Sequence, residues 1–194
     1  FIDYQRNSAW TWEHLALTRA RVVSGPPELR QIIERTISEV LRRPRDRAQV
    51  AADVRVMRDK IVEEKGTHDI WDLKNVRGGL IDIEFLTQFL QIVSAHDHPE
   101  VLDQNTVAAL NKLLGAQVLN RADAEILIPA ATLYHTLTQC LRLCLDKPFV
   151  PDAAPRALKD LLARASDMPD FATLEAMLKD TLAAVHALYE RVVA

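Results

Sequence analysis

The sequence predicts an all-α protein: a helical bundle of about seven to eight helices with one short extended segment before a pair of adjacent glycines. Apolar side chains recur three and four positions apart along most of the 194 residues, which places them on one face of an α-helix. Only five glycines occur, and no two segments show the alternating apolar and polar residues of paired strands. Together these observations favour helices joined by short connections.

The first predicted helix covers residues 6–24, just before a glycine and two prolines that stop it. Polar and aromatic side chains surround this helix instead of forming one apolar stripe, a pattern that fits a helix between two domains. We therefore expect Trp10, Trp12 and Glu13 at a domain interface. Packing of the tryptophans within the core of the same domain is the alternative that the sequence leaves open.

Two further helices are expected before the glycine pair. The second covers residues 28–43, and the third begins at Asp46, a favourable N-cap, and reaches Gly66. The second helix should turn one apolar face inward, formed by Leu29, Ile32, Ile33, Ile37, Val40 and Leu41. On the third helix, a solvated face is expected to carry four charged residues: Arg55, Arg58, Asp59 and Lys60.

The remainder of the chain repeats the helical spacing. The helix after the glycine pair should end near Ala95, and two more should begin at the N-cap residues Asn105 and Asn120. A connector with three prolines then separates the long helix from two amphipathic ones. The five helices expected in this part cover residues 80–95, 105–115, 120–146, 156–165 and 171–193.

Composition excludes several classes of protein. The net charge is −3, with 24 basic and 27 acidic residues interspersed, so a dedicated nucleic-acid binder is not expected. No apolar run approaches the roughly 20 residues that span a bilayer, so no membrane partner is expected. Cys140 and Cys144 make a poor zinc site and should be small buried residues in a reducing cytoplasm. We expect a single cytoplasmic domain over residues 1–194, taken from a longer chain, with residues 1–25 as a linking helix and 26–194 as the bundle.

The stretch around which the chain is organised contains Gly78 and Gly79, between a non-helical segment at residues 68–77 and a helix. Adjacent glycines let the backbone approach another group closely or adopt a positive φ. The first turn of the following helix exposes unpaired N–H groups that can hold an anion, and Lys74 and Arg77 add positive charge just upstream. This stretch therefore predicts a site for an anionic group, with a plain glycine-broken connection as the alternative.

Asp82 and Glu84 follow the glycines and have the spacing of a D-x-E metal-binding pair. On a helix, however, residues two apart point to nearly opposite sides, whereas residues three or four apart share a face. Asp82 also lies in the first turn, where the helix dipole favours a carboxylate whatever its role. We therefore expect no metal site from this pair.

Two blocks of sequence resemble a known family, the bifunctional glutamine synthetase adenylyltransferase/deadenylylating enzymes. The first resembles their helical module: Lys74 followed by Gly78-Gly79-x-x-Asp82-Ile83-Glu84-Phe85-x-x-Gln88. The second resembles the segment after the nucleotidyltransferase domain in the adenylylating, C-terminal half: Ala9-Trp10-Thr11-Trp12-Glu13-His14, with Arg19 and Arg21 further on. With a weaker block over residues 105–143, the resemblance spans nearly the whole chain.

The resemblance implies a helical accessory domain that packs against an upstream nucleotidyltransferase domain of the same chain. The complete enzyme would use ATP and Mg²⁺ to adenylylate a tyrosine of glutamine synthetase, its protein substrate, with the PII regulatory protein as a further partner. The catalytic domain of the family carries a Gly-Ser loop and a D-x-D pair. Neither occurs here, so we expect no catalytic residue and no activity in this chain alone.

The resemblance also implies residues that support nucleotide binding or the catalytic cleft. Cations would pair with phosphates or with catalytic carboxylates, glycines would allow close backbone approach, and acidic residues would orient the cations. The residues expected in these three roles are Lys74, Arg19 and Arg21, then Gly78 and Gly79, then Asp82 and Glu84.

Two alternatives remain. A stand-alone helical protein-interaction module would use the motif residues for structure only, and an upstream domain with the Gly-Ser loop and D-x-D pair would argue against it. The equivalent domain of a PII uridylyltransferase carries a similar Gly-Gly-Leu-x-Asp element. It is disfavoured because residues 9–14 resemble the adenylyltransferase more closely.

Overall fold

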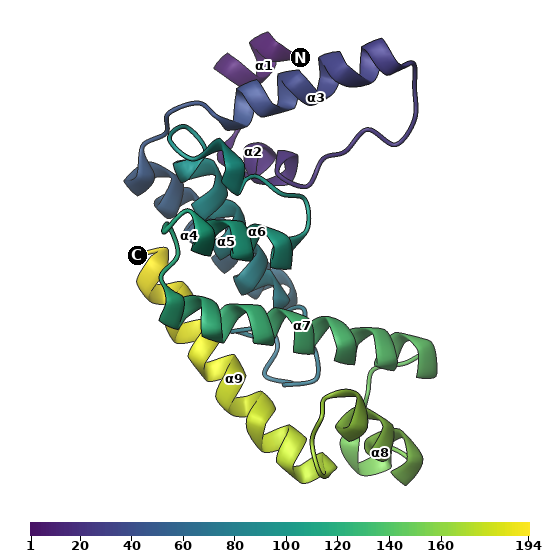
Figure 1. The fold of residues 1–194 in the computed structure, drawn as a ribbon. Helices are drawn as coiled ribbons and strands as arrows, with labels where there is room; N and C mark the ends of the chain where they lie inside the picture. Colours follow the sequence, from purple (N-terminus) through teal and green to yellow (C-terminus); the bar gives the residue numbers. More distant parts are fainter.

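The computed structural model describes all of residues 1–194 and confirms the all-α prediction, with nine α-helices, two short 3₁₀ helices and no strand (Figure 1). The extra α-helix arises because the first predicted helix is divided in two. In chain order the elements are α1 (Ile2–Asn7), α2 (Thr11–Leu17), α3 (Pro27–Leu41), α4 (Arg47–Lys65), α5 (Leu80–Ser94), η1 (Pro99–Val101), α6 (Thr106–Gly115), α7 (Arg121–Cys144), η2 (Pro151–Ala153), α8 (Arg156–Ala165) and α9 (Phe171–Val192).

Helix α5 forms the centre of the bundle. It contacts α2, α4, α6, α7 and α9, and Ile83, Leu86, Phe89 and Ile92 on it are fully buried. A helix that is covered on nearly every side is expected to be mostly apolar, and α5 is, although it also buries polar residues such as Asp82 and Gln91. The glycine pair immediately before α5 is therefore held against the core of the molecule rather than at its edge.

Side-chain caps fix the predicted helix starts. The Asp46 carboxylate accepts hydrogen bonds from the backbone N–H groups of Ala48 (2.8 Å) and Gln49 (3.1 Å) at the start of α4. Asn105 caps α6 and Asn120 caps α7 in the same manner. Because these bonds satisfy N–H groups that have no partner within the helix, the local sequence is sufficient to set these boundaries.

The prediction of one continuous helix over residues 6–24 is wrong. Helix α1 ends at Asn7, α2 ends at Leu17, and the chain is non-helical from there to Pro26. The Glu13 carboxylate accepts the backbone N–H of Trp10 (2.8 Å) and the Tyr4 hydroxyl (2.7 Å). Because the Glu13 side chain accepts the N–H of the residue three positions earlier, Trp10 becomes the N-cap of a new helix. This explains the break that divides α1 from α2.

The segment before the glycines is a series of turns, so the predicted extended piece is also wrong. Asp69 accepts the backbone N–H of Trp71 (2.9 Å), and Asp72 accepts that of Asn75 (3.3 Å). Such short-range bonds from aspartate to backbone favour turns over extended structure. The Trp71 ring stacks on Phe171 of α9 with 5.3 Å between ring centroids, and this contact anchors the turns to the bundle.

The predicted inner face of the second helix is only partly inside. Val40 and Leu41 at the end of α3 are buried, but Leu29, Ile32 and Ile33 are 50%, 62% and 37% exposed. Helix α3 contacts α1 and α2, and its first half projects beyond the rest of the bundle (Figure 1). The helical spacing identified the apolar face correctly, but no part of this chain covers its first half.

Two smaller expectations also differ from the structure. Cys140 is half-buried, but Cys144, the last residue of α7, is exposed, so its predicted burial is wrong. Arg55 is half-buried and donates a hydrogen bond to the carbonyl of Val193, whereas Asp59 and Lys60 are exposed as expected. None of the helices has the length and apolar character needed to cross a membrane.

Candidate functional site

The Gly78-Gly79 turn packs directly against α9. Gly78 has φ = +79°, and a Cβ atom at this position would lie 1.9 Å from the carbonyl oxygen of Leu182. A Cβ on Gly79 would lie 2.5 Å from the carbonyl oxygen of Leu73. Both glycines thus permit the close backbone approach that the sequence predicts, but the group that they approach belongs to this chain.

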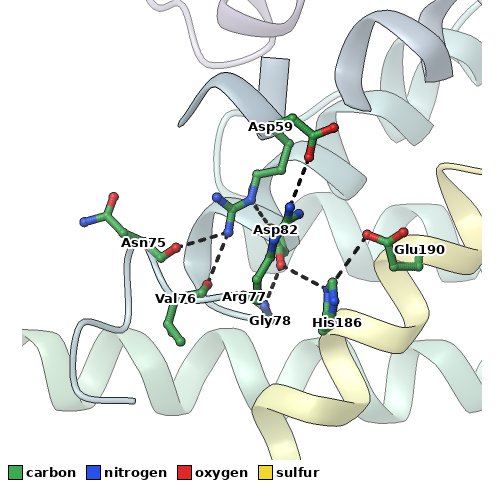
Figure 2. Close-up of polar contacts among 9 residues, drawn as sticks. Asp59, Asn75, Val76, Arg77, Gly78, Asp82, His186 and Glu190 are labelled. Atoms are coloured by element: carbon green, nitrogen blue, oxygen red, sulfur yellow. Dashed lines mark hydrogen bonds and ion pairs between the residues drawn. The ribbon is translucent and has the colours of Figure 1, made fainter. Parts of the chain in front are cut away.

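A buried ion pair holds the turn (Figure 2). The Arg58 guanidinium donates from Nε to Asp82 Oδ1, and the backbone N–H of Gly78 donates to Asp82 Oδ2. Arg58 Nη2 also donates to the carbonyl oxygens of Asn75 (3.1 Å) and Val76 (3.3 Å). One arginine and one carboxylate therefore bind three backbone groups of the turn through charge-assisted hydrogen bonds.

This arrangement overturns the expectation that Arg58 is solvated, because its side chain and that of Asp82 are both fully buried. Arg58 lies one helical turn after Val54, on the face of α4 that carries Val50 and Ala51 into the core. The helical spacing therefore indicated that Arg58 is buried. The prediction of a solvated side chain followed the residue type instead, because arginine is usually exposed. It also follows that Asp82 orients Arg58, and not the cations at positions 74, 19 and 21.

Helix α9 contributes a histidine to the same cluster. His186 Nδ1 lies 3.9 Å from Asp82 Oδ2 and 4.0 Å from Glu190 Oε1 (Figure 2). Burial, and secondarily the negative charge of Asp82, raises the pKa of Tyr134 and of Tyr189 above its usual range. Both phenols therefore remain protonated near neutral pH, and they offer hydroxyl groups rather than general bases.

Glu84 points to a different place from Asp82, as helical geometry predicts for residues two apart. It forms an ion pair with Arg19, with 2.7 Å between Oε1 and Nη1, and the two side chains are 23% and 48% exposed. Glu84 thus contacts one of the cations named with it, and the role of this pair at a nucleotide cleft stays a prediction. Arg21, two residues further on, is exposed and forms no ion pair.

Lys74 belongs to neither cluster. It is exposed, forms no ion pair, and lines a pocket of about 420 Å³ between the turns before α5 and the end of α7. Arg142 and Lys147 line the same pocket. The structure thus separates the candidate residues into a buried group around Asp82, a surface pair at Arg19 and Glu84, and an unpaired lysine.

The residues predicted for a domain interface lie on one surface. Trp10 is 71% exposed and Trp12 is 53% exposed, and with Tyr4 and Val56 they line a hollow of about 610 Å³ over α2 and α4. Large aromatic side chains rarely remain this exposed on a surface that has no partner. Glu13 lines the same hollow and, through its bonds to Tyr4 and Trp10, fixes α1 against the start of α2.

A buried histidine joins this N-terminal part to the bundle. His14 Nδ1 lies 3.1 Å from Arg45 Nη1, and His14 Nε2 lies 3.2 Å from the carbonyl oxygen of Gln5. Because arginine can only donate, Nδ1 accepts and Nε2 donates, so His14 is the neutral tautomer with the proton on Nε2. Burial, followed by the charge of Arg45, lowers the pKa of His14.

Acidification should therefore loosen the N-terminal part of the chain. A histidine whose pKa is lower in the folded state binds fewer protons there than in the unfolded state, so its contribution to stability is lost as pH falls below about 6.5. The melting temperature of wild type should fall between pH 7 and pH 5, and His14→Gln should show a smaller fall. His68→Gln, at an exposed position, is the control and should behave like wild type. Identical pH profiles for wild type and His14→Gln would contradict this prediction.

Models of two known protein families match parts of the chain. A protein-family model described as GlnD PII-uridylyltransferase matches residues 55–193, more than two thirds of the chain, including the second half of α4, the glycine pair and α9. The chain belongs to this family. A second model, described as Glutamate-ammonia ligase adenylyltransferase, matches residues 1–36 of this GlnD-family chain.

Curated relatives of this GlnD-family chain carry the adenylyltransferase name. The chain is 51% identical over its whole length to the bifunctional glutamine synthetase adenylyltransferase/adenylyl-removing enzyme of Rhodopseudomonas palustris (strain TIE-1), of which it covers 20%. It is 50% identical over 97% of its length to the enzyme of that name from Bradyrhizobium diazoefficiens, and 46% identical over 99% to that from Xanthobacter autotrophicus, covering 19% of each. The resemblance predicted from two blocks is confirmed, and the chain spans about a fifth of the length of these relatives.

Proposed function

We propose that this chain is the helical accessory domain of an enzyme that adenylylates glutamine synthetase in the cytoplasm. The single observation that carries the proposal is the 51% identity over the full chain to a relative of that name. The uridylyltransferase alternative has the description of one family model in its favour, whereas the relatives that match along the whole chain are named adenylyltransferases.

The chemistry would take place on another part of the longer protein. A tyrosine hydroxyl of glutamine synthetase would attack the α-phosphate of ATP, the bond to the β-phosphate would break, and pyrophosphate would leave as the hydroxyl loses its proton. Mg²⁺ bound by a D-x-D pair would neutralise the phosphate charge. This chain contains no such pair. Its contribution would be to pack beside a nucleotidyltransferase domain and help to place the substrates, while PII acts on the full-length enzyme.

Two exposed apolar surfaces support this packing role. The first is the hollow around Trp10 and Trp12, and the second is the uncovered face of α3. Both lie at the N-terminal end of the structure, where α1, α2 and α3 are neighbours (Figure 1). A neighbouring domain that covered them would bury several large side chains, each contributing roughly 1.5–3 kcal/mol when fully buried.

The surface cations would serve the catalytic cleft. Lys74 has no partner in this chain, so its ammonium group is free to meet a phosphate or a catalytic carboxylate. Arg19 is already oriented by Glu84, and Arg21 is unpaired. The roles of Gly78, Gly79 and Asp82 would be indirect, because they fix the turn that follows Lys74 and contact no surface ligand themselves.

The proposal predicts that the chain of residues 1–194 is inactive by itself. Incubation with ATP, Mg²⁺ and glutamine synthetase should leave the substrate tyrosine unmodified in intact-mass and peptide-mass spectra, because the chain lacks the D-x-D pair that binds Mg²⁺ in the catalytic domain. The full-length protein in a parallel reaction should add AMP to that tyrosine. Modification that depends on the isolated chain, or a full-length protein without this activity, would each contradict the proposal.

Lys74→Ala in the full-length enzyme should lower kcat/KM for ATP by about ten- to a hundredfold. One charge-assisted contact in a largely desolvated cleft contributes roughly 1.5–3 kcal/mol. The melting temperature should not change, because Lys74 is exposed and unpaired in the structure. Lys179→Ala, at another exposed position, is the control. A change of less than about twofold for Lys74→Ala would place Lys74 among ordinary solvated lysines.

A further inference from the structure

A groove on the C-terminal half of the molecule is separate from all of these residues. It runs between α7, the turn from α8 to α9 and the middle of α9, and its volume is about 680 Å³. Helices α7 and α9 diverge here toward α8 (Figure 1). The side chains that form most of its floor are apolar and partly exposed: Ile126, Ile128, Leu133, Met168 and Met177.

The charged groups that line this groove are all acidic. They are Glu125, Asp167 and Asp180, and no lysine, arginine or histidine lines it. Asp167 and Asp180 form no ion pair, and Glu125 pairs only with Arg121 on its own helix. Pro129, also in the lining, has no N–H group, so the carbonyl of Glu125 lacks its usual helical donor. The rim therefore offers acceptors to a partner that brings donors and positive charge.

The dimensions fit a helix. The part of α7 that lines the groove extends from Glu125 to Thr136 and rises roughly 18 Å, the length of about 12 helical residues. A third helix can pack between two diverging helices by placing its side chains in their grooves. No strand is present whose edge could pair with an extended peptide. Methionines in the floor suit helix binding because their flexible side chains adapt to different apolar shapes.

We propose that this groove, formed by α7, the α8–α9 turn and α9, binds a basic amphipathic helix of a partner protein. The helix would place apolar residues spaced i, i+3, i+4 and i+7 against the floor, and lysine or arginine on its flanks would face Glu125, Asp167 and Asp180. The inference is independent of the adenylyltransferase proposal, because it uses neither the Trp10–Trp12 surface nor the Gly78-Gly79 turn.

The three methionines of the chain allow a direct test. Met168 and Met177 line the groove, whereas Met57 lies in α4 and lines the Trp10–Trp12 hollow. The chain would be labelled with ¹³C at the methionine methyl groups and titrated with a synthetic amphipathic helix of about 14 residues, long enough to fill the groove, built from leucine and lysine. Saturable shifts are expected for Met168 and Met177, with Met57 unchanged. A peptide with glutamate in place of lysine should bind about tenfold more weakly or not at all.

Charge reversal separates the groove from general attraction to an acidic protein. Glu125→Lys/Asp180→Lys should weaken binding of the lysine peptide by about tenfold. Glu63→Lys/Glu64→Lys makes the same change of net charge on exposed residues of α4 and should leave the affinity unchanged. Equal losses in the two double variants, equal binding of the two peptides, a matching shift at Met57, or no shift at Met168 and Met177 would each overturn the proposal.

Discussion

Replacing Asp82 with alanine should lower the free energy of unfolding by about 3–5 kcal/mol. The substitution removes the only carboxylate that contacts Arg58, and it leaves a guanidinium with no exposed surface without a compensating charge. The backbone N–H of Gly78 loses its acceptor as well. Urea unfolding followed by circular dichroism would measure the loss directly. Because the turn before α5 depends on the same pair, activity of the full-length enzyme should fall together with stability.

Two variants separate burial of charge from loss of contacts. Asp59→Ala removes a comparable carboxylate whose pair with Arg77 is exposed to solvent, and it should cost at most about 1 kcal/mol. Arg58→Met/Asp82→Leu removes both charges and should recover only part of the stability lost in Asp82→Ala. It avoids an unpaired buried charge, but it leaves the Gly78 N–H and the carbonyls of Asn75 and Val76 without these partners. Equal stabilities for Asp82→Ala and Asp59→Ala would show that the Arg58–Asp82 pair is hydrated in solution.

The parts of the fold that depend on local sequence could be predicted. Asp46, Asn105 and Asn120 begin helices because their side chains satisfy N–H groups two or three residues ahead, and nothing distant is needed. The division between α1 and α2 is also local, since Glu13 caps Trp10. The sequence nevertheless does not indicate this break, because residues 6–24 contain no proline or glycine that would mark it.

The parts that depend on packing could not be predicted in the same way. The helical period shows which side of α3 is apolar, but it cannot show that Leu29 and Ile32 have no neighbour to cover them. For Arg58 the period favoured burial and the residue type favoured exposure. The conflict is resolved only by Asp82, which lies 24 residues away in the sequence. A buried pair of this kind becomes visible only when both helices are placed.

The candidate site was predicted in part for the same reason. Helical geometry was sufficient to predict that Asp82 and Glu84 point in different directions. In the structure Asp82 points inward to Arg58, and Glu84 points outward to Arg19. Two adjacent glycines indicate close approach, but they do not identify what is approached. Here it is the backbone of α9 at Leu182, from the other end of the chain. The role of Lys74 rests on its position and free charge, and it stays a prediction.

Gly78→Ala should be among the most destabilising single substitutions in the chain, with a loss of about 2–5 kcal/mol in the free energy of unfolding. At φ = +79° a Cβ atom is strained by roughly 1–2 kcal/mol in any surroundings. The new atom would also lie 1.9 Å from the Leu182 carbonyl oxygen and 2.7 Å from its carbon. These are backbone atoms of α9, so no rotation of a side chain can relieve the overlap. The turn and α9 would have to separate, which would pull Asp82 away from the Gly78 N–H and from His186.

Gly25 and Gly115 provide matched controls for this prediction. Gly25 has a positive φ of 138°, and no atom lies within 4 Å of the place that a Cβ would occupy, so Gly25→Ala measures backbone strain without overlap. Gly115, at the end of α6, has neither strain nor overlap, and Gly115→Ala should leave stability unchanged or raise it slightly. The free energy of unfolding measured in urea should therefore be much lower for Gly78→Ala than for Gly25→Ala. The value for Gly25→Ala should in turn be below that for Gly115→Ala. If Gly78→Ala and Gly25→Ala had the same free energy of unfolding, the turn would not pack tightly against α9 in solution. The contact between Asp82 and Gly78 could then not fix the chain after Lys74.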